Sequence, residues 1–267
     1  MLGAVFLRFL FLFILLYSSN VFAHEGEHDD HNKDEDKILI FSKTSWYRHP
    51  KIPEVNGSLV RLFDKHHVRA DVSESSKDFN EKNLSQYKVI LFQSTTDIGV
   101  SFDEKQKAAF KKWYSNGGGL MALHAAFVHH KHWDWFSELA ACDFDSDSEH
   151  VETKIMVDPS FAGNELAAGH KKPFMLDSEW LNFDKSVTGV EGVKVVLRAD
   201  DTSFEPVREF FKKKGKKPME KDHPVSWIRE WNGGKLFYTG IGHDRRSIES
   251  DFAKKHLMAA YRWLAKD

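Results

Sequence analysis

The sequence predicts an α/β fold built on a doubly wound, mostly parallel sheet, with an antiparallel hairpin near the C-terminus. Four short apolar runs alternate with segments of helical periodicity, as is typical of parallel strands that are buried on both faces; they span residues 38–41, 68–72, 89–92 and 120–123. The hairpin is predicted by Asn232-Gly233-Gly234, because Asn-Gly accepts the positive φ angles of tight turns. This turn joins two further strand patterns, 224–231 and 235–239.

The remaining elements follow from spacing and capping signals. A helix after the first strand is predicted by apolar residues three to four positions apart, namely Val55, Leu59, Leu62 and Phe63. Ser101 and Glu104 fit a capping box that would begin the next helix, and Gly117 would end it. Further strands are predicted at 151–157 and 193–197, and an amphipathic helix over 252–264 closes the chain.

Composition limits the classes of protein that need to be considered. The chain has 267 residues, of which 41% are hydrophobic, enough for one large core, so we expect a single domain over residues 38–267. A formal net charge of −2 gives no electrostatic basis for a nucleic-acid partner. The single cysteine, Cys142, excludes an intrachain disulfide and a metal site made of several cysteines.

The N-terminus resembles an export signal. Arg8 precedes the apolar stretch 9–16, and Val21-Phe22-Ala23 supplies small residues, so we expect residues 1–23 to be a signal peptide that is cleaved after Ala23. The mature protein would then be periplasmic or secreted, without stable insertion in a membrane. An uncleaved anchor is the alternative, although the apolar stretch is short for a span, which needs roughly 20 residues.

A tail rich in histidine and acids follows, over residues 24–37. It contains no apolar residue and should be a flexible spacer, because it cannot offset the entropy of ordering. Its histidines, His24, His28 and His31, could also bind Zn²⁺ or Cu²⁺ loosely.

Two histidines stand where predicted strands end. His124 follows the run 120–123 directly, and His243 follows the second hairpin strand after Gly240 and Gly242. In parallel sheets the ligand crevice lies beyond the carboxyl ends of the strands, so both side chains are candidates for chemistry. The alternative for His124 is a core histidine bonded to a backbone carbonyl.

Several motifs together resemble the ThuA-like (trehalose utilisation) family, within the superfamily of the class I glutamine amidotransferase fold. The resemblance covers roughly residues 38–266. The motifs are Ser42-Lys43-Thr44 with Arg48-His49, Ser94-Thr95-Thr96, Gly117-Gly118-Gly119 through His124, Asp177-Ser178-Glu179-Trp180, and Asp222-His223-Pro224 through His243.

The resemblance implies a flavodoxin-like sheet and a role in sugar metabolism. It also implies a departure from the amidotransferases, which place a nucleophilic cysteine after the strand that here ends at Leu123. This chain has His124 at that position, so a thiol-based transfer is not expected. His150 stands in the region where the family often has a His-Pro pair, and its membership of the site is left open.

The candidate site combines histidines and carboxylates at one edge of the sheet. We predict His124, His243 and Glu179 as catalytic residues, because imidazoles transfer protons near neutral pH and a carboxylate orients them. Asp177 would bring a second carboxylate to this edge. The predicted substrate-binding residues are Arg48, His49, Thr95, Thr96, Trp180 and His223. The alternative for Trp180 is core packing, and for Arg48 and the threonines it is loop capping.

The same residue types would also suit an open divalent-metal site, with His49, His124, Glu179 and His243 as candidate ligands. Sequence spacing does not separate a metal site from acid–base chemistry, because the residues come from distant segments.

The leading hypothesis is an exported enzyme of carbohydrate utilisation, of hydrolase or isomerase/lyase type, that acts on a glycoside or a keto-sugar. Its rival is a non-catalytic carbohydrate-binding protein. A metal-handling protein that depends on the tail is a third hypothesis, which deletion of residues 24–37 would test.

Overall fold

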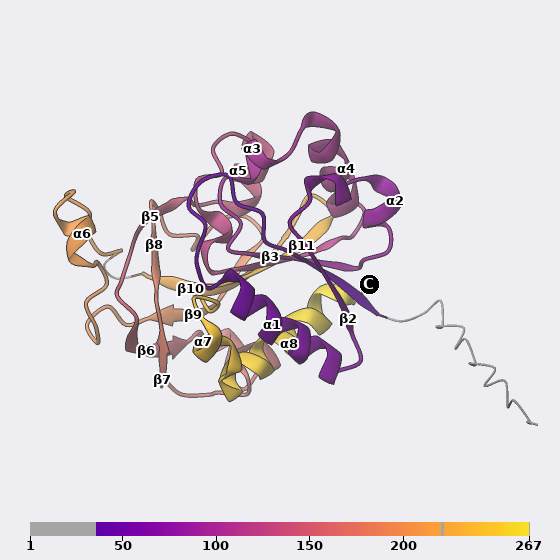
Figure 1. The fold of residues 1–267 in the computed structure, drawn as a ribbon. Coiled ribbons are helices and arrows are strands. Elements are labelled where there is room, and N and C mark those ends of the chain that lie inside the picture. Colours follow the sequence, from indigo (N-terminus) through magenta and orange to yellow (C-terminus); the bar gives the residue numbers. More distant parts are fainter. Residues whose placement is uncertain (1–35, 220–221, 267) are drawn as a thin grey trace, which may run out of the picture. The chain divides into compact units, whose positions relative to one another are not determined.

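A computed structural model describes residues 36–219 and 222–266 (Figure 1). The predicted signal peptide, and the predicted tail up to residue 35, lie outside the described residues. Lys37, which was assigned to the tail, is the first residue of strand β1.

A nine-stranded sheet organises the described chain, in the order β2-β1-β3-β4-β11-β10-β9-β6-β7. Its first five strands in this order are parallel, which confirms that the four apolar runs form parallel strands of one sheet. They are β2 (Arg69–Ser73), β1 (Lys37–Phe41), β3 (Val89–Gln93), β4 (Gly119–Leu123) and β11 (Gly234–Thr239).

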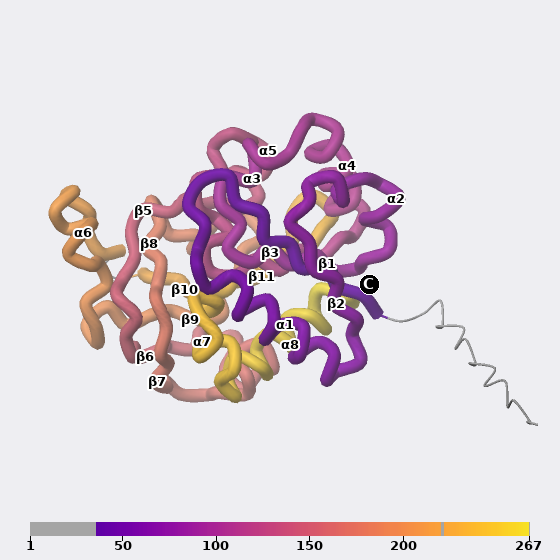
Figure 2. The backbone as a smooth tube through the Cα atoms, in the orientation of Figure 1, coloured from indigo at the N-terminus to yellow at the C-terminus, as the bar shows by residue number. Residues whose placement is uncertain are grey.

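The antiparallel part of the sheet is larger than the predicted hairpin. The hairpin itself, β10 and β11, is confirmed, and three more antiparallel strands extend it away from β2 (Figure 2). In the hairpin, β10 spans Pro224–Trp231; the three further strands are β9 (Val193–Ala199), β6 (Val151–Val157) and β7 (Phe174–Ser178). A second, two-stranded sheet pairs β5 (Phe144–Asp147) with β8 (Leu181–Phe183).

Helices cover both faces of the large sheet, as a doubly wound fold requires (Figure 1). One face carries α1 (Ile52–Lys65), α7 (Arg245–Glu249) and α8 (Asp251–Ala265). The other carries α2 (Glu81–Leu84), α3 (Ile98–Ser101), α4 (Glu104–Ser115) and α5 (Asp134–Ala140). The short α6 (Glu209–Lys212) lies near β5 and β8.

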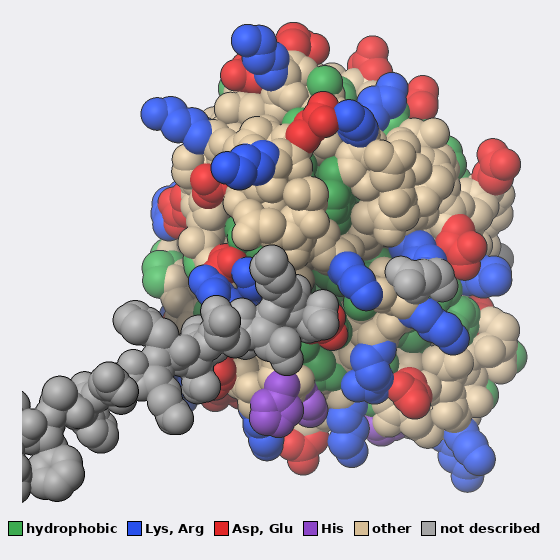
Figure 3. All heavy atoms as spheres, turned by 90° about the vertical axis from the view of Figure 1, so that its right-hand side faces the viewer, with side chains coloured by type: hydrophobic (Ala, Val, Ile, Leu, Met, Phe, Trp, Pro, Cys, Tyr) green, Lys and Arg blue, Asp and Glu red, His purple; other side chains and the backbone are tan. Residues whose placement is uncertain are grey.

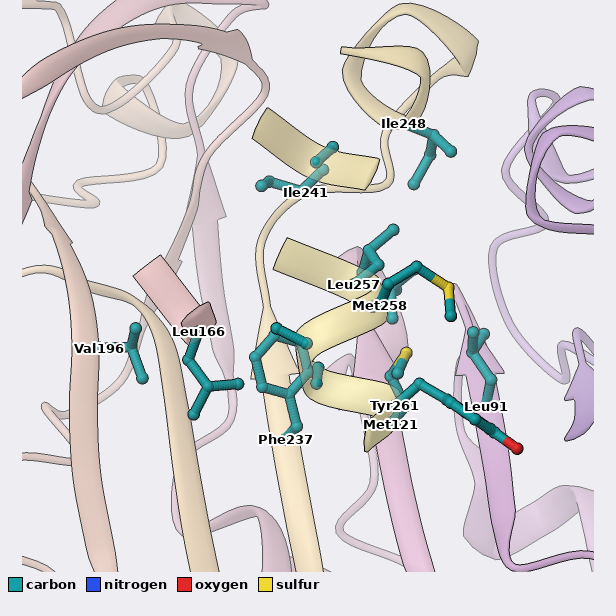
Figure 4. Close-up of a cluster of buried hydrophobic side chains, with 14 of the residues drawn as sticks. Leu91, Met121, Leu166, Val196, Phe237, Ile241, Ile248, Leu257, Met258 and Tyr261 are labelled. Carbon is teal, nitrogen blue, oxygen red and sulfur yellow. The ribbon is translucent and has the colours of Figure 1, made fainter. Parts of the chain in front are cut away.

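Alternate side chains of each central strand enter different cores. In β1, Ile38 and Ile40 pack with α1 and α8, whereas Leu39 and Phe41 pack with the helices of the other face. The same alternation holds in β3 and β4, because successive side chains of a strand point to opposite faces. Figure 4 shows the first core, where Leu91 and Met121 of the sheet meet Leu257 and Met258 of α8.

The start of α4 differs from the prediction. Its N-cap is Asp103, whose carboxylate accepts the Gln106 amide N–H, while the Gln106 side chain accepts the Asp103 amide N–H. The predicted pair, Ser101 and Glu104, does not form this capping box because Ser101 ends the preceding helix α3. Both pairs have the required spacing, and the order of the elements decides between them.

The surface is electrostatically mixed. The face shown in Figure 3 interleaves lysine and arginine side chains with acidic ones, in keeping with the small net charge. Among the described residues, no helix combines the length and apolar character that a membrane span needs.

A buried histidine in α8 should make the fold sensitive to acid. Burial lowers the pKa of His256 from 6.5 to about 4, although its contact with the Leu166 carbonyl acts in the opposite direction. The unfolded chain therefore takes up this proton first, so the stability that depends on neutral His256 is complete above pH 6.5 and is lost as the pH falls to 4. One proton corresponds to a slope of about 1.4 kcal/mol per pH unit.

His256→Phe should reduce this slope by about one proton's worth, since the ring would stay among Phe237 and Phe252 but carry no titrating group. Urea unfolding at a series of pH values measures it. The exposed residue His66 provides the control, as His66→Gln should leave the slope unchanged. An unchanged slope in His256→Phe would contradict the prediction.

Candidate active site

The carboxyl ends of the parallel strands deliver the first two histidines. His124 follows β4 directly and has a positive φ of 50°, an uncommon backbone conformation for a residue with a side chain. His243 lies in the connection between β11 and α7. Gly242 beside it approaches closely, because a Cβ at this position would lie 3.3 Å from the Leu123 Cβ and 3.4 Å from the His124 Cβ. The two histidines thus lie together at the carboxyl ends of the neighbouring strands β4 and β11.

Two paired connections bring the remaining groups to this edge. The β5–β6 connection carries His150 and the β7–β8 connection carries Glu179. The Ser148 amide N–H donates to the Trp180 carbonyl at 2.9 Å, and the Trp180 amide N–H donates to Ser148 Oγ at 3.0 Å. These two bonds fix His150 and Glu179 relative to each other.

Glu179 lies between the two strand-end histidines. Its Oε1 is 3.4 Å from His124 Nε2, and its Oε2 is 3.4 Å from His243 Nε2. The His124 side chain is 1% exposed, whereas those of Glu179 and His243 are 15% and 18% exposed. A ligand can therefore reach Glu179 and His243, while His124 contacts Glu179 from the buried side.

His49 completes the cluster from the loop after β1. Its ring centroid is 4.7 Å from that of His243 and 5.6 Å from that of His124. The Lys51 amide N–H donates to His49 Nδ1 at 3.2 Å. In the neutral imidazole the proton is therefore on Nε2, which makes this atom a hydrogen-bond donor.

The contacts within the cluster shift the pKa values of its carboxylate and of its histidines. Burial opposes ionisation of Glu179, but the imidazoles of His124, His243 and His49 outweigh it and lower the pKa of Glu179 to about 2. Burial, together with the charge of His124, lowers the pKa of His49 and of His243 to about 4. At neutral pH the site therefore holds an ionised carboxylate beside two neutral imidazoles.

Two residues of this region were not identified from the sequence as members of the site. His150 Nδ1 is 3.3 Å from His243 Nδ1, and His150 Nε2 is 2.9 Å from Asp177 Oδ2. Asp147 is buried against Arg208; burial and the charge of Glu179 raise its pKa to about 7 despite that guanidinium. In the sequence, His150 was marked only by its place in the region where the family often has a His-Pro pair. No pattern in the sequence marked Asp147 as a member of the site.

Five predicted substrate-binding residues are buried or engaged in other contacts. Arg48 forms an exposed ion pair with Glu74 at 2.6 Å. Buried His223 contacts Asp201 Oδ1 at 2.6 Å and the Leu181 carbonyl at 3.0 Å, so both ring nitrogens are occupied. Thr96 donates to the Tyr47 carbonyl. Thr95 is fully buried and Trp180 lies in the core, and the Thr95 hydroxyl and the Trp180 Nε1 have no hydrogen-bond partner among the described residues. Of the predicted binding residues, His49 alone contacts the cluster.

Trp180 was predicted to offer a ring face to a sugar, and its burial is inconsistent with that role. Its side chain is 1% exposed and packs near Gly240, 3.4 Å from the position of a Cβ there. Glu179 faces the cluster, and consecutive side chains of an extended segment point in opposite directions, so its neighbour enters the core.

The donors within reach of one metal ion differ from the predicted set. Among the described residues, His150, His243 and Asp244 bring one ligand atom each to within 4.8 Å of one another. His243 is the single member that the sequence proposed; His49, His124 and Glu179 surround the group instead of belonging to it.

A cavity of about 380 Å³ lies at the opposite end of the strands. It is lined by residues that precede β3 and β4, including Lys88 and Gly118, and by the end of α8. This cavity is remote from the histidines and holds none of the predicted site residues.

The fold and the strand-end cluster define a doubly wound α/β protein that holds histidines and a carboxylate together at the carboxyl ends of its parallel strands. The model of the family described as "ThuA: Trehalose utilisation" matches residues 37–264. The chain belongs to the ThuA family. That description gives it a carbohydrate-related role.

Solved structures share this fold at low identity. A ThuA-like protein from Bacteroides uniformis ATCC 8492 is 19% identical, with a TM-score of 0.67 over 86% of this chain and 91% of that chain. A ThuA-like protein from Parabacteroides merdae ATCC 43184 is 15% identical, with a TM-score of 0.65 over 87% and 90% of the two chains.

A β-galactosidase from Bacillus circulans sp. alkalophilus is 10% identical, with a TM-score of 0.52 over 86% of this chain but 31% of the enzyme. These likenesses concern the fold alone. A comparison with curated proteins finds no match.

Proposed function

We propose that the chain is an exported enzyme of carbohydrate utilisation that moves a proton on a keto-sugar or a glycoside. The observation that carries the proposal is the position of Glu179, with one carboxylate oxygen 3.4 Å from His124 and the other 3.4 Å from His243. A carboxylate held between imidazoles at the carboxyl edge of a parallel sheet is a proton-transfer group in the place where such folds bind ligands.

The charge state of the cluster suits general base catalysis at neutral pH. His243 is neutral and partly exposed, and ionised Glu179 would stabilise the imidazolium that forms when His243 accepts a proton. The low pKa of His243 keeps its lone pair available. His49 would donate its Nε2 proton to a substrate oxygen as negative charge develops there.

A base beside a hydrogen-bond donor favours the keto-sugar. Abstraction of a proton next to a carbonyl leaves negative charge on the carbonyl oxygen, which a donor such as His49 stabilises. Glycoside hydrolysis commonly uses two carboxyl groups on either side of the bond. Of the other carboxyls in this region, Asp147 is buried and paired with Arg208, while Asp177 and Asp244 contact His150 and Arg246.

Deuterium exchange tests this proposal without knowledge of the final product. The chain is incubated in D₂O with keto-sugars and with the parent glycosides, trehalose among them, and the reaction is followed by NMR. We expect deuterium at the carbon next to the keto group. If sugars bind, as measured by calorimetry, but neither exchange nor hydrolysis occurs, the carbohydrate-binding alternative is supported and the enzyme proposal fails.

Export has its own test. The proposal rests on the apolar stretch 9–16 and on Val21-Phe22-Ala23. We expect the protein recovered from the periplasm or the medium to begin at His24, as judged from its intact mass. A recovered chain that still carries residues 1–23 would contradict it.

A further inference from the structure

Two segments that are far apart in the sequence bring together three side chains of the types that commonly ligate metal ions. His150 comes from the β5–β6 connection, and His243 and Asp244 come from the connection between β11 and α7. One ligand atom from each lies within 4.8 Å of the others. Asp244 is held in place because its Oδ1 accepts the Ser247 amide N–H at 2.9 Å, while its Oδ2 faces His150 and Arg246.

The two imidazoles turn the same ring nitrogen toward each other. His150 Nδ1 and His243 Nδ1 are 3.3 Å apart, and Asp244 Oδ2 is 3.7 Å from His150 Nδ1. A carboxylate lies near each of the opposite nitrogens: His243 Nε2 is 3.4 Å from Glu179, and His150 Nε2 is 2.9 Å from Asp177. A carboxylate on the outer nitrogen of a histidine is the usual support of a metal ligand, since it fixes the ring and raises its basicity.

The distances fit a metal ion without rearrangement of the backbone. Zinc binds imidazole nitrogen at about 2.0–2.1 Å, so two nitrogens on a tetrahedral ion lie roughly 3.3–3.4 Å apart. The two Nδ1 atoms already have this separation. The Asp244 oxygen, 3.7 Å from His150 Nδ1 and within 4.8 Å of the His243 ligand atom, would need to move closer to the ion. Three protein ligands would leave a position open for water or a sugar hydroxyl, as in catalytic sites.

The guanidinium of Arg246 would compete with a metal ion for the carboxylates of Asp244 and Asp177. Its Nε donates to Asp244 Oδ2 at 3.1 Å, and its Nη1 is 3.9 Å from Asp177 Oδ2. The guanidinium thus neutralises the acids from the outside. Its side chain is 70% exposed, so it can leave without breaking the core. Arg246 does not, however, explain why the two Nδ1 atoms face each other.

We propose that His150, His243 and Asp244 bind one divalent first-row transition ion, of which zinc is the type that the donor set fits directly. The role of this ion rests on the proposed function, because it would place a Lewis acid beside Glu179 and His49. Its binding does not depend on that function. With the ion on Nδ1 of His243, the contact between Nε2 and Glu179 is kept. Both ring nitrogens of His243 are then engaged, so in the metal-bound chain Glu179 would accept the proton in place of His243.

Metal titration of the purified chain tests the site. The chain is freed of metal with a chelator and titrated with Co²⁺, whose visible absorption reports its coordination, and Zn²⁺, Mn²⁺ and Fe²⁺ then compete with it. We expect one tight equivalent, with binding at least about 100-fold weaker in His150→Gln. Asp244→Asn should also weaken binding while keeping the helix cap, since asparagine caps as well as aspartate.

Replacements of Asp177 and Arg246 should change the metal affinity in opposite directions. Asp177→Asn should weaken binding by about 10–100-fold, the usual effect of removing the partner of a ligating histidine. Arg246→Gln should bind the ion as tightly as the unchanged chain or more tightly, since it removes the competing charge. Melting curves of every variant exclude loss of binding through unfolding.

The tail provides the decisive control, because His24, His28 and His31 can bind metal on their own. Replacement of all three by glutamine should leave the tight equivalent in place. If the tail variant loses the ion while His150→Gln keeps it, or if His150→Gln binds like the unchanged chain, the proposal is wrong. Tight binding without any sugar chemistry would keep the metal site and overturn the proposed function alone.

Discussion

Replacement of Glu179 by glutamine is expected to reduce turnover on the sugar substrate by ~10²–10⁴, the usual effect of losing a general acid or base. The amide keeps the size of the side chain but removes the charge that contacts both His124 and His243. The variant should melt at a lower temperature, because the low pKa of Glu179 means that the fold stabilises its ionised form, but it should still be folded at the temperature of the assay. The deuterium-exchange rate and the thermal melt measure the two effects.

Glu149→Gln is the matched control for this experiment. Glu149 is an exposed glutamate next to His150, so its replacement changes the net charge equally and close to the site. Exchange should continue at the original rate. A Glu179→Gln chain that unfolds, or one that keeps full activity, would show that Glu179 has a structural role or none.

The second large effect concerns stability. Trp180→Ala should lower the free energy of unfolding by about 3–5 kcal/mol, the usual cost of truncating a buried aromatic residue to alanine. The side chain is 1% exposed and belongs to the core that α1 and α8 cover. Denaturant unfolding gives the value directly.

Trp46→Ala provides the comparison, because Trp46 is 58% exposed. Its replacement should change the stability by no more than about 0.5 kcal/mol. If Trp180→Ala is as stable as the unchanged chain but loses sugar binding, the sequence-based role of Trp180 as a stacking residue returns and its assignment to the core is wrong.

The central sheet could be predicted because its signal is local. The strand 89–92 is apolar at every position, since one set of its side chains enters each core. The hairpin was equally visible in Asn232-Gly233. Local signals failed where two of them competed, as at the start of α4, where Ser101 and Asp103 both begin a possible capping box.

The strand-end members of the candidate site were predictable from local sequence, whereas Glu179 and His49 entered the prediction through the motifs of the family resemblance. The positions of His124 and His243 follow from the strands that precede them. His150 depends on a bond between the β5–β6 and β7–β8 connections, formed by Ser148 and Trp180, which are 32 residues apart. A hydrogen bond between two distant connections leaves no periodic pattern in the sequence. For the same reason the sequence could not show that Glu179 faces the cluster while its neighbour Trp180 enters the core.

The order of the strands also bears on self-association. Strands β2 and β7 are the two edges of the sheet, and an edge strand offers its free backbone groups to strands of other molecules. In β2 the exposed Val72 is preceded by the ion pair of Arg69 and Asp71, which would have to lose water if a second strand docked there. Charges along that edge act as a safeguard against aggregation, and neutralising both would make the folded chain prone to stack edge to edge.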